Sequence, residues 1–288
     1  MRYHVVQSFE DAVRISAATD GVSRFLAGGT DVIVQMRTGM VTPDDLIDIK
    51  HISGVRDILR MESGGWRIGV AVSGAMLSAH DALRFEWPGV VEGMALVGST
   101  QVQGRATITG NLCNGSPAAD SVPGLVAAGA TVTVIGPHGQ REVPIESIPA
   151  GPGRTTLAKG ELISAIHLPP RGAFAADAYL RFIPRTEMDI AVVGCAVNLR
   201  LEGEKIAAAR VALGAVAPTV LLVEEAGAAI TGTRLDPTAL DRLATAASAA
   251  CRPISDKRGT VEFRTDVAGV LARRVAAIAY ERAKGKQQ

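Results

Sequence analysis

The chain contains little cysteine, and this excludes the metal centres that cysteine ligands build. Only Cys113, Cys195 and Cys251 occur among its 288 residues, far apart and without a CxxC motif. Because iron–sulfur clusters usually need four cysteine ligands and zinc sites need clustered cysteine or histidine, we expect neither centre on this chain. Scattered cysteines in odd number are typical of a reducing compartment.

Net charge and long apolar runs are lacking too. The 30 basic and 29 acidic side chains nearly cancel, so no overall field would attract nucleic acid or an anionic membrane surface. No run approaches the roughly 18 consecutive apolar residues of a membrane span, and residues 1–6 do not form the apolar core of a signal peptide. We therefore expect a cytoplasmic protein with no nucleic-acid partner and no membrane span.

The side chains that catalysis requires are not clustered. None of the five histidines shares a metal-binding spacing with another, and none forms a recognisable constellation with a nucleophile and an acid. A Ser–His–Asp hydrolase is therefore not indicated. The sequence predicts no catalytic side chain and no metal ligand on this chain.

Apolar side chains are abundant, at 47% of the residues, and they recur in the short periodic segments of a globular protein. The expected strands are residues 3–6, 23–27, 46–50, 66–72, 131–135, 161–168, 191–201 and 206–216. The expected helices are residues 9–18, one from about 31, several within 73–97, and 125–129, 223–230, 240–250 and 266–284. The pattern changes near residues 170–178, from strands alternating with helices to strands followed by helices. This predicts an α+β protein with a first domain over residues 1–172, whose small lobe ends near residue 55, and a C-terminal α+β domain over 173–288.

A strand that runs into two glycines is the first segment that could carry chemistry. Gly28 and Gly29 follow the strand and precede a helix start, for which Thr30 is a possible N-cap. Glycines let the backbone approach a ligand, and free N–H groups at a helix start favour phosphate. A tight turn without a ligand explains the same pattern equally well. The segment is not the GxGxxG of a Rossmann fold, which is therefore not supported.

The second segment, residues 107–121, is dense in small polar side chains. Its hydroxyls, amides and exposed N–H groups could bond to phosphate and ribose, and Asp120 could accept from sugar hydroxyls. The alternative is an extended surface loop with Asx and Ser turns. Leu112 and Val122 would hold the loop in the core and so favour a ligand site. Cys113 is predicted to be a packed residue, because no basic partner is evident nearby.

The third segment, residues 179–191, is rich in charge. Arg181, Arg185, Glu187 and Asp189 could form an ion network at the surface.

Taken together, these segments resemble the FAD-binding medium subunit of the molybdenum hydroxylases, the xanthine dehydrogenase and carbon monoxide dehydrogenase group. The resemblance rests on residues 27–31, 106–112, 116–120, 214–219 and 258–264 and spans the whole chain. It implies an FAD-binding domain of two α/β subdomains, about residues 1–55 and 56–172, followed by a three-stranded antiparallel sheet and three helices. Thr109 stands where the family usually has glycine. Thr30-Asp31 favours the purine, nicotinate and aryl-coenzyme A enzymes over the carbon monoxide dehydrogenase branch.

The resemblance also implies which residues bind FAD. The pyrophosphate would lie against a continuous run: Phe25, Leu26, Ala27, Gly28, Gly29, Thr30, Asp31 and Val32. The phosphate, the ribose and the flavin side would be contacted by Thr107, Gly110, Asn111, Ser116 and Asp120. Ile163 and Arg181 match further flavin-contacting positions, and Ile190 would lie near the isoalloxazine ring.

The family's partners are a large molybdopterin subunit, which oxidises the substrate at molybdenum, and a small subunit with two [2Fe–2S] clusters, arranged as a dimer of heterotrimers. The resemblance implies that electrons pass from these clusters to FAD on this chain and then to an external acceptor. The alternatives are a free-standing FAD-dependent oxidoreductase, which would need an acid or base over the flavin, and a cofactor-free scaffold. Residues that select the organic substrate would lie on the partner subunit.

Overall fold

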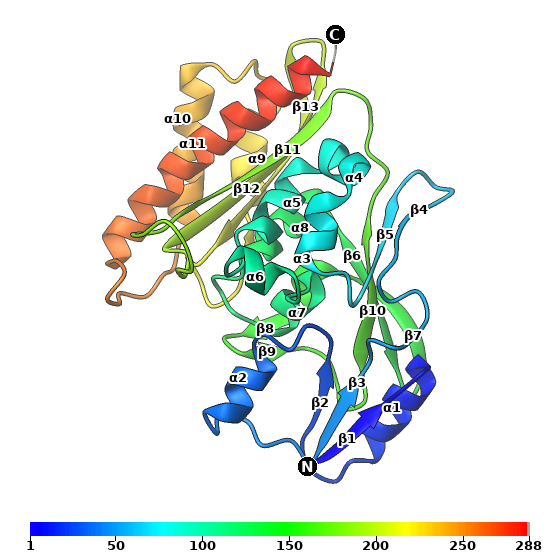
Figure 1. The fold of residues 1–288 in the computed structure, drawn as a ribbon. Coiled ribbons are helices and arrows are strands. Elements are labelled where there is room, and N and C mark those ends of the chain that lie inside the picture. The colour runs from blue at the N-terminus through cyan, green and yellow to red at the C-terminus, as the bar shows by residue number, and fades with distance from the viewer. Residues whose placement is uncertain (287–288) are drawn as a thin grey trace.

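The computed structural model describes residues 1–286. Figure 1 shows three stacked parts: a small N-terminal lobe, a central helix-and-sheet layer, and a C-terminal sheet crossed by long helices. No helix among residues 1–286 is both long enough and apolar enough to cross a bilayer.

The N-terminal lobe is a parallel sheet in the order β1-β3-β2, with bounds β1 (Arg2–Val5), β2 (Ser23–Leu26) and β3 (Asp45–Asp48). Helix α1 (Phe9–Ala18) connects β1 to β2, and it begins where Ser8 accepts a hydrogen bond from the Asp11 N–H at 3.1 Å. Helix α2 (Val32–Arg37) follows β2. This confirms the expected βαβ opening, in which the loop after β2 lies at the carboxyl end of the sheet.

The central sheet is antiparallel, and its strand order is β4-β5-β10-β6-β7. Its strands are β4 (Ile58–Arg60), β5 (Trp66–Gly69), β6 (Thr131–Gly136), β7 (Gly139–Pro144) and β10 (Leu162–Leu168). Strand β10 enters the middle, because it pairs with β5 on one side and with β6 on the other. A separate pair, β8 (Pro149–Gly151) and β9 (Arg154–Thr155), precedes β10 together with the single-turn η1 (Ile145–Ser147).

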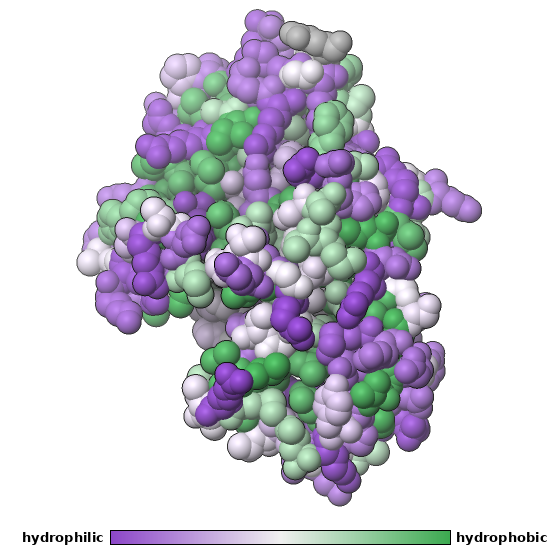
Figure 2. All heavy atoms as spheres, viewed as in Figure 1, coloured by the Kyte–Doolittle hydropathy of each residue, from purple (hydrophilic) through white to green (hydrophobic). Residues whose placement is uncertain are grey.

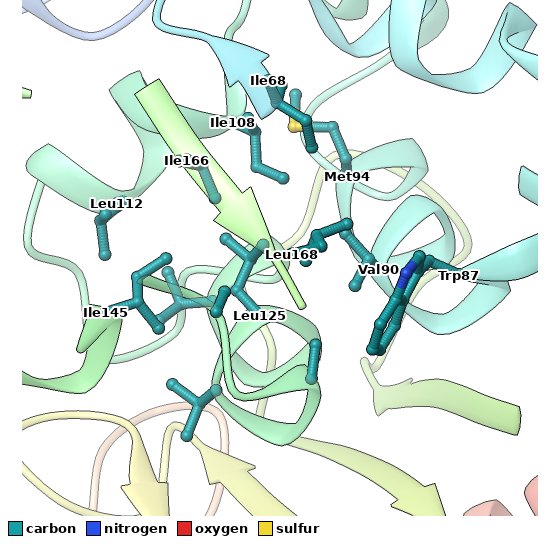
Figure 3. Packing of buried hydrophobic residues seen from close by; sticks show 14 of the residues in the cluster. Ile68, Trp87, Val90, Met94, Ile108, Leu112, Leu125, Ile145, Ile166 and Leu168 are labelled. Atoms are coloured by element: carbon teal, nitrogen blue, oxygen red, sulfur yellow. The ribbon is translucent and has the colours of Figure 1, made fainter. Parts of the chain in front are cut away.

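Six helices complete the central layer between this sheet and the C-terminal sheet: α3 (Gly74–Ala79), α4 (Asp81–Glu86), α5 (Pro88–Ala95), α6 (Thr100–Gln103), α7 (Ile108–Cys113) and α8 (Ser121–Ala128). Figure 3 shows the core they enclose, in which Ile108 and Leu112 of α7 face Ile166 and Leu168 of β10. Since Leu112 and Val122 are both buried here, the polar segment between them is held against the core as expected.

The C-terminal sheet has the order β11-β12-β13-β14, with bounds β11 (Ala175–Phe182), β12 (Val193–Glu202), β13 (Lys205–Gly214) and β14 (Leu221–Leu222). One face packs on α9 (Glu224–Ile230), α10 (Pro237–Ala250) and α11 (Val261–Gly285). The other face contributes Tyr179, Ala196 and Ala212 to the core of the central layer. The sheet is thus buried on both sides.

Three expectations about elements need correction. The C-terminal sheet has a fourth strand beyond the expected three, because the two-residue β14, too short to show a period, pairs with β13. Helix α8 begins at Ser121 and not at residue 125, since Pro123 lies in the first turn, where its missing N–H costs nothing. Strand β7 is absent from the expected strands, because its exposed polar side chains show no alternation.

Candidate functional site

The loop after β2 approaches the backbone that precedes α7. Gly29 has a φ of +79°, which glycine adopts without strain. A Cβ on Gly28 would lie 2.1 Å from the carbonyl oxygen of Arg105. No side chain fits there, so the Gly28-Gly29 turn and the segment that begins at residue 107 are in direct contact. The two segments, almost 80 positions apart in the sequence, form one site.

A polar cleft of about 210 Å³ opens where the two segments meet. Gly28 and Thr107 line it together with Lys50, Arg56 and Arg105, and no acidic residue is among the lining residues. Lys50 pairs with Asp48 at 2.6 Å, whereas the side chains of Arg56 and Arg105 form no ion pair within residues 1–286. The cleft is therefore positively charged, which favours a phosphate group.

Sequence reasoning missed the three cations of this cleft. Lys50 and Arg56 lie just beyond the carboxyl end of β3, where ligands of such sheets bind. Arg105 directly precedes the polar segment. The sequence did contain a signal for these cations, because Lys50 and Arg56 follow a predicted strand and Arg105 precedes a predicted motif.

The polar segment starts with a helix cap at the cleft. The hydroxyl oxygen of Thr107 accepts a hydrogen bond from the Gly110 N–H at 3.0 Å and so begins α7. Thr107 also pairs across an isolated bridge with Ser73, the N-cap of α3. Two helix starts consequently lie side by side at the cleft, and they are tied together because the Gly74 N–H donates to the Ala106 carbonyl oxygen at 2.9 Å.

Thr109, which replaces the family's usual glycine, is buried in α7, and its hydroxyl oxygen has no hydrogen-bond partner within residues 1–286. A buried hydroxyl without a partner is costly unless a ligand satisfies it. Thr109 is thus a buried side chain of α7 whose hydrogen bonding is incomplete in the part of the chain described.

Asn111 joins α7 to α8. Its Oδ1 accepts hydrogen bonds from the Ser121 hydroxyl at 2.7 Å and from the Ser121 N–H at 3.3 Å. Ser116 accepts a hydrogen bond from the Ala118 N–H at 3.2 Å in a Ser turn. Both side chains keep donors that remain available, the Asn111 amide nitrogen and the Ser116 hydroxyl hydrogen.

Asp120 is buried, and both of its carboxylate oxygens have partners. Tyr179 donates to Oδ1 at 2.8 Å and Arg181 donates to Oδ2 at 2.5 Å. Burial raises the pKa of the Asp120 carboxyl, while Arg181 and Tyr179 oppose that shift. Each carboxylate oxygen of Asp120 retains a second lone pair, so the carboxylate can accept a further hydrogen bond from a ligand hydroxyl.

Arg181 does not belong to the expected surface network, because it points inward to Asp120. Of that network, Arg185 and Asp189 do pair, at 3.6 Å, and Asp189 also lies 3.8 Å from Arg258. Ile190 follows Asp189 and is 51% exposed. Arg181 donates to the Asp189 carbonyl oxygen at 3.3 Å, so the backbone that directly precedes Ile190 lies beside the Asp120–Arg181 pair.

Three other predicted residues have their side chains in a core. Ile163 is buried in the central core at a β-bulge of β10, so only its backbone could face a ligand. Leu26 is buried and Phe25 packs against the core of the N-terminal lobe. Of residues 25–32, the part at the site is therefore the loop from Ala27 onward. Asp31 rather than Thr30 occupies the N-cap position of α2, and its side chain forms no capping hydrogen bond.

Helix α2 lies over the end of α7, because Gln35 donates to Asn114 at 3.1 Å. None of its side chains is fully buried, and Figure 2 shows apolar surface around its position. The exposed apolar residues there include Val34 and Met40.

Metal or thiol chemistry is not supported by these residues. Residues 1–286 contain no group of three or more His, Cys, Asp or Glu side chains that could hold a metal ion. Burial raises the pKa of the Cys113 thiol to about 12. The prediction that Cys113 is a packed residue is confirmed.

Comparisons with known families match both halves of the chain. Residues 1–171 match the model of the FAD binding domain in molybdopterin dehydrogenase, and residues 178–279 match that of the CO dehydrogenase flavoprotein C-terminal domain.

Among curated proteins, the chain is 36% identical to the carbon monoxide dehydrogenase medium chain of Afipia carboxidovorans, over 98% of this chain and 97% of that one. It is 29% identical to a putative xanthine dehydrogenase FAD-binding subunit of Escherichia coli K12, over 99% and 98%. The higher identity does not support the branch that Thr30-Asp31 favoured.

Among solved structures, reconstituted CO dehydrogenase from Oligotropha carboxidovorans contains a similar chain, with a TM-score of 0.93, 35% identity and 97% coverage of both chains. The carbon monoxide dehydrogenase of Hydrogenophaga pseudoflava that lacks the Mo-pyranopterin moiety gives a TM-score of 0.93, 32% identity and 98% coverage of both chains.

Proposed function

Since this chain belongs to the FAD-binding subunits of the molybdopterin dehydrogenases, we propose that it is the electron-transfer subunit of a molybdenum hydroxylase. In this role it receives electrons from [2Fe–2S] clusters of a partner subunit and delivers them to an external acceptor. Bound FAD supplies the redox chemistry, and the protein binds, orients and shields it.

The observation that carries the proposal is the contact between Gly28 and Arg105. That contact places the Gly28-Gly29 turn at the edge of a cleft lined by Lys50, Arg56 and Arg105. A glycine backbone at the rim of the cleft, next to Arg56 and Arg105, which form no ion pair within residues 1–286, fits a pyrophosphate.

We assign the cofactor contacts from this arrangement. The loop from Ala27 to Val32 holds the pyrophosphate through backbone N–H groups, with Phe25 and Leu26 fixing it to the lobe core. The rest of the cofactor, from the phosphate and ribose to the flavin, is contacted by residues of the polar segment: Thr107, Gly110, Asn111, Ser116 and Asp120. Arg181 orients Asp120, the backbone of Ile163 closes the site from below, and Ile190 covers the flavin side.

An electron-transfer subunit of this kind requires partner subunits. We propose a large molybdopterin subunit and a small iron–sulfur subunit, assembled as a dimer of heterotrimers in the cytoplasm. Substrate oxidation then takes place on the large subunit. The domain division proposed is 1–172 and 173–288, with subdomains that meet near residue 55.

The first experiment measures flavin in the purified chain. We expect about one equivalent of FAD, bound non-covalently. Acid precipitation should release the flavin into the supernatant. Flavin that stays in the pellet would contradict non-covalent binding, and a folded, colourless protein would contradict the cofactor assignment.

The second experiment separates this role from that of a free-standing flavoenzyme. Substrate loss is followed with this chain alone and after the molybdenum and iron–sulfur subunits are added back. We expect turnover only in the reconstituted complex, although the chain alone can exchange electrons with NADH or oxygen. Oxidation of a heterocycle or an aldehyde by this chain alone would support the free-standing enzyme instead.

A further inference from the structure

A second pocket, of about 170 Å³, lies between the central layer and the C-terminal sheet. Trp87, at the junction of α4 and α5, and Arg171, just beyond β10, line it from the central layer. Arg200 of β12 and Arg210 of β13 line it from the sheet. It shares no lining residue with the cleft at Gly28. Figure 3 shows Trp87 at the edge of the central core.

The pocket is lined by three arginines and by no aspartate or glutamate. Arg171 is neutralised from behind by Asp177 at 2.8 Å, and Arg210 lies 3.7 Å from Glu146. The Arg200 side chain forms no ion pair or hydrogen bond within residues 1–286. At least one positive charge of the pocket is therefore uncompensated.

Arg171 is held rigidly in this pocket. Its guanidinium carbon lies 3.7 Å from the centre of the Trp87 ring, and its Nη2 donates to Asn198 at 2.6 Å. With 4% of its side chain exposed, it is fixed before any ligand arrives. A guanidinium fixed in this way loses little side-chain entropy when an oxyanion binds.

The pocket also has hydrogen-bond donors without acceptors. Within residues 1–286 the Nε1 of Trp87 and the Nε atoms of Arg171 and Arg210 are buried and have no partner. Buried donors without a partner are rare and costly, so three of them on residues that line one pocket point to a missing acceptor.

We propose that this pocket binds a small oxyanion, a phosphate or a short carboxylate. The charge selects an anion, and the free donors select oxygen acceptors. The volume is below the roughly 300 Å³ of pockets for drug-sized ligands, so the anion is small. Because the lining residues come from both layers, the bound anion stabilises the seam between them.

The test uses the purified full-length chain in a phosphate-free buffer. Thermal unfolding and titration calorimetry are followed as sodium phosphate or sodium malonate is added, with sodium chloride at equal ionic strength as the reference. We expect saturable binding of one equivalent of one of the two anions, with a higher melting temperature. The tighter of the two identifies the chemical class.

Three substitutions locate the anion. Arg200→Gln should weaken its binding by about tenfold or more, as expected for loss of a charge-assisted hydrogen bond. Arg242→Gln, on the exposed side of α10, is the matched control, and Arg56→Gln alters the cleft at Gly28. Neither control should change the affinity. The proposal is overturned if neither anion binds saturably, or if either control weakens binding as much as Arg200→Gln.

Discussion

The backbone of Gly28 lies against the carbonyl group of Arg105, so closely that a Cβ on Gly28 would be 2.1 Å from that oxygen. The contact joins the N-terminal lobe to the helix start at residue 107. It therefore bounds the cleft that we propose for the FAD pyrophosphate.

The first prediction is that Gly28→Ala pushes these segments apart and lowers FAD affinity by roughly tenfold, since overpacking of a tight contact costs about 1–3 kcal/mol. Bound flavin is measured by absorbance after desalting, together with the melting temperature. Gly285→Ala is the control, because a Cβ there meets nothing within 4 Å. Full flavin content in Gly28→Ala would place the phosphate elsewhere.

The second prediction compares two glycines with similar backbones. Gly29 and Gly39 have φ values of +79° and +71°, so valine at either position should cost about 1–3 kcal/mol of unfolding free energy. At Gly29 the added Cβ also meets Leu26 and Ile33 at 2.9 Å, whereas at Gly39 it meets nothing within 4 Å. Only Gly29→Val should lose FAD. Equal flavin loss in both variants would show that backbone strain alone is responsible.

The third prediction concerns the unpaired hydroxyl of Thr109. Thr109→Val removes a buried group without a partner, so the FAD-free protein should gain about 1 kcal/mol of unfolding free energy. If the hydroxyl meets the cofactor, FAD affinity should fall by about tenfold in the same variant. Urea unfolding and flavin titration give the two quantities. A gain in stability with unchanged affinity would remove Thr109 from the site.

The fourth prediction concerns the buried pair of Asp120 and Arg181, whose side chains are 8% and 5% exposed. Asp120→Asn or Arg181→Met alone should cost about 3–5 kcal/mol of unfolding free energy, because each leaves a buried charge unpaired. The double variant should recover part of that loss, and urea unfolding of all four proteins measures it. The exposed pair Arg14 and Asp11 serves as a control, with an expected coupling below about 1 kcal/mol. Additive costs at Asp120 and Arg181 would contradict the coupling.

The fifth prediction is a pH dependence in the N-terminal lobe. Hydrogen bonds from Arg2 and His4 lower the pKa of Asp45 well below its usual 3.8. Its contribution to stability is therefore present above pH 3.8 and is lost as the pH falls towards the folded-state pKa. The unfolding free energy of the wild type should drop below that pH, and Asp45→Asn should flatten the drop. Asp120 acts in the opposite direction, because burial raises its pKa. Equal acid sensitivity in both proteins would assign the drop to other carboxyls.

Much of the fold could be predicted from local patterns, where one residue decides the outcome. Ser8 begins α1 as expected, because its hydroxyl accepts from the N–H of Asp11. The starts of α10 and α11 were expected too late. Asp236 and Thr260 cap them several residues earlier, through hydrogen bonds to Ala239 at 2.9 Å and to Phe263 at 3.2 Å. A cap is a single side chain and adds nothing to apolar periodicity, so the period alone places such boundaries too far inward.

The candidate site was predicted in its glycines but not in its cations. Gly28 and Gly29 were predicted because they follow a strand and precede a helix start, and because they match the family's first motif. Arg56 was not predicted, since an exposed arginine in a loop is ordinary, and its place in the cleft depends on how β3 lies beside β2. Ile163 shows the reverse case. The family resemblance predicted that Ile163 contacts the flavin. Its burial in β10 depends on strand partners that lie more than 20 residues away in the sequence.

The position of β10 between β5 and β6 has a consequence for synthesis on the ribosome. The central sheet stays split into two hairpins, β4-β5 and β6-β7, until residues 162–168 leave the exit tunnel. Until then β5 and β6 each have an unpaired apolar edge. Trp66, for example, pairs with Leu168, which is translated about a hundred codons later. Such a late, non-local pairing makes for slow folding and leaves nascent chains open to association. Chains truncated before β10 should therefore aggregate. Chaperone binding to the nascent chain should be strongest before β10 has been translated.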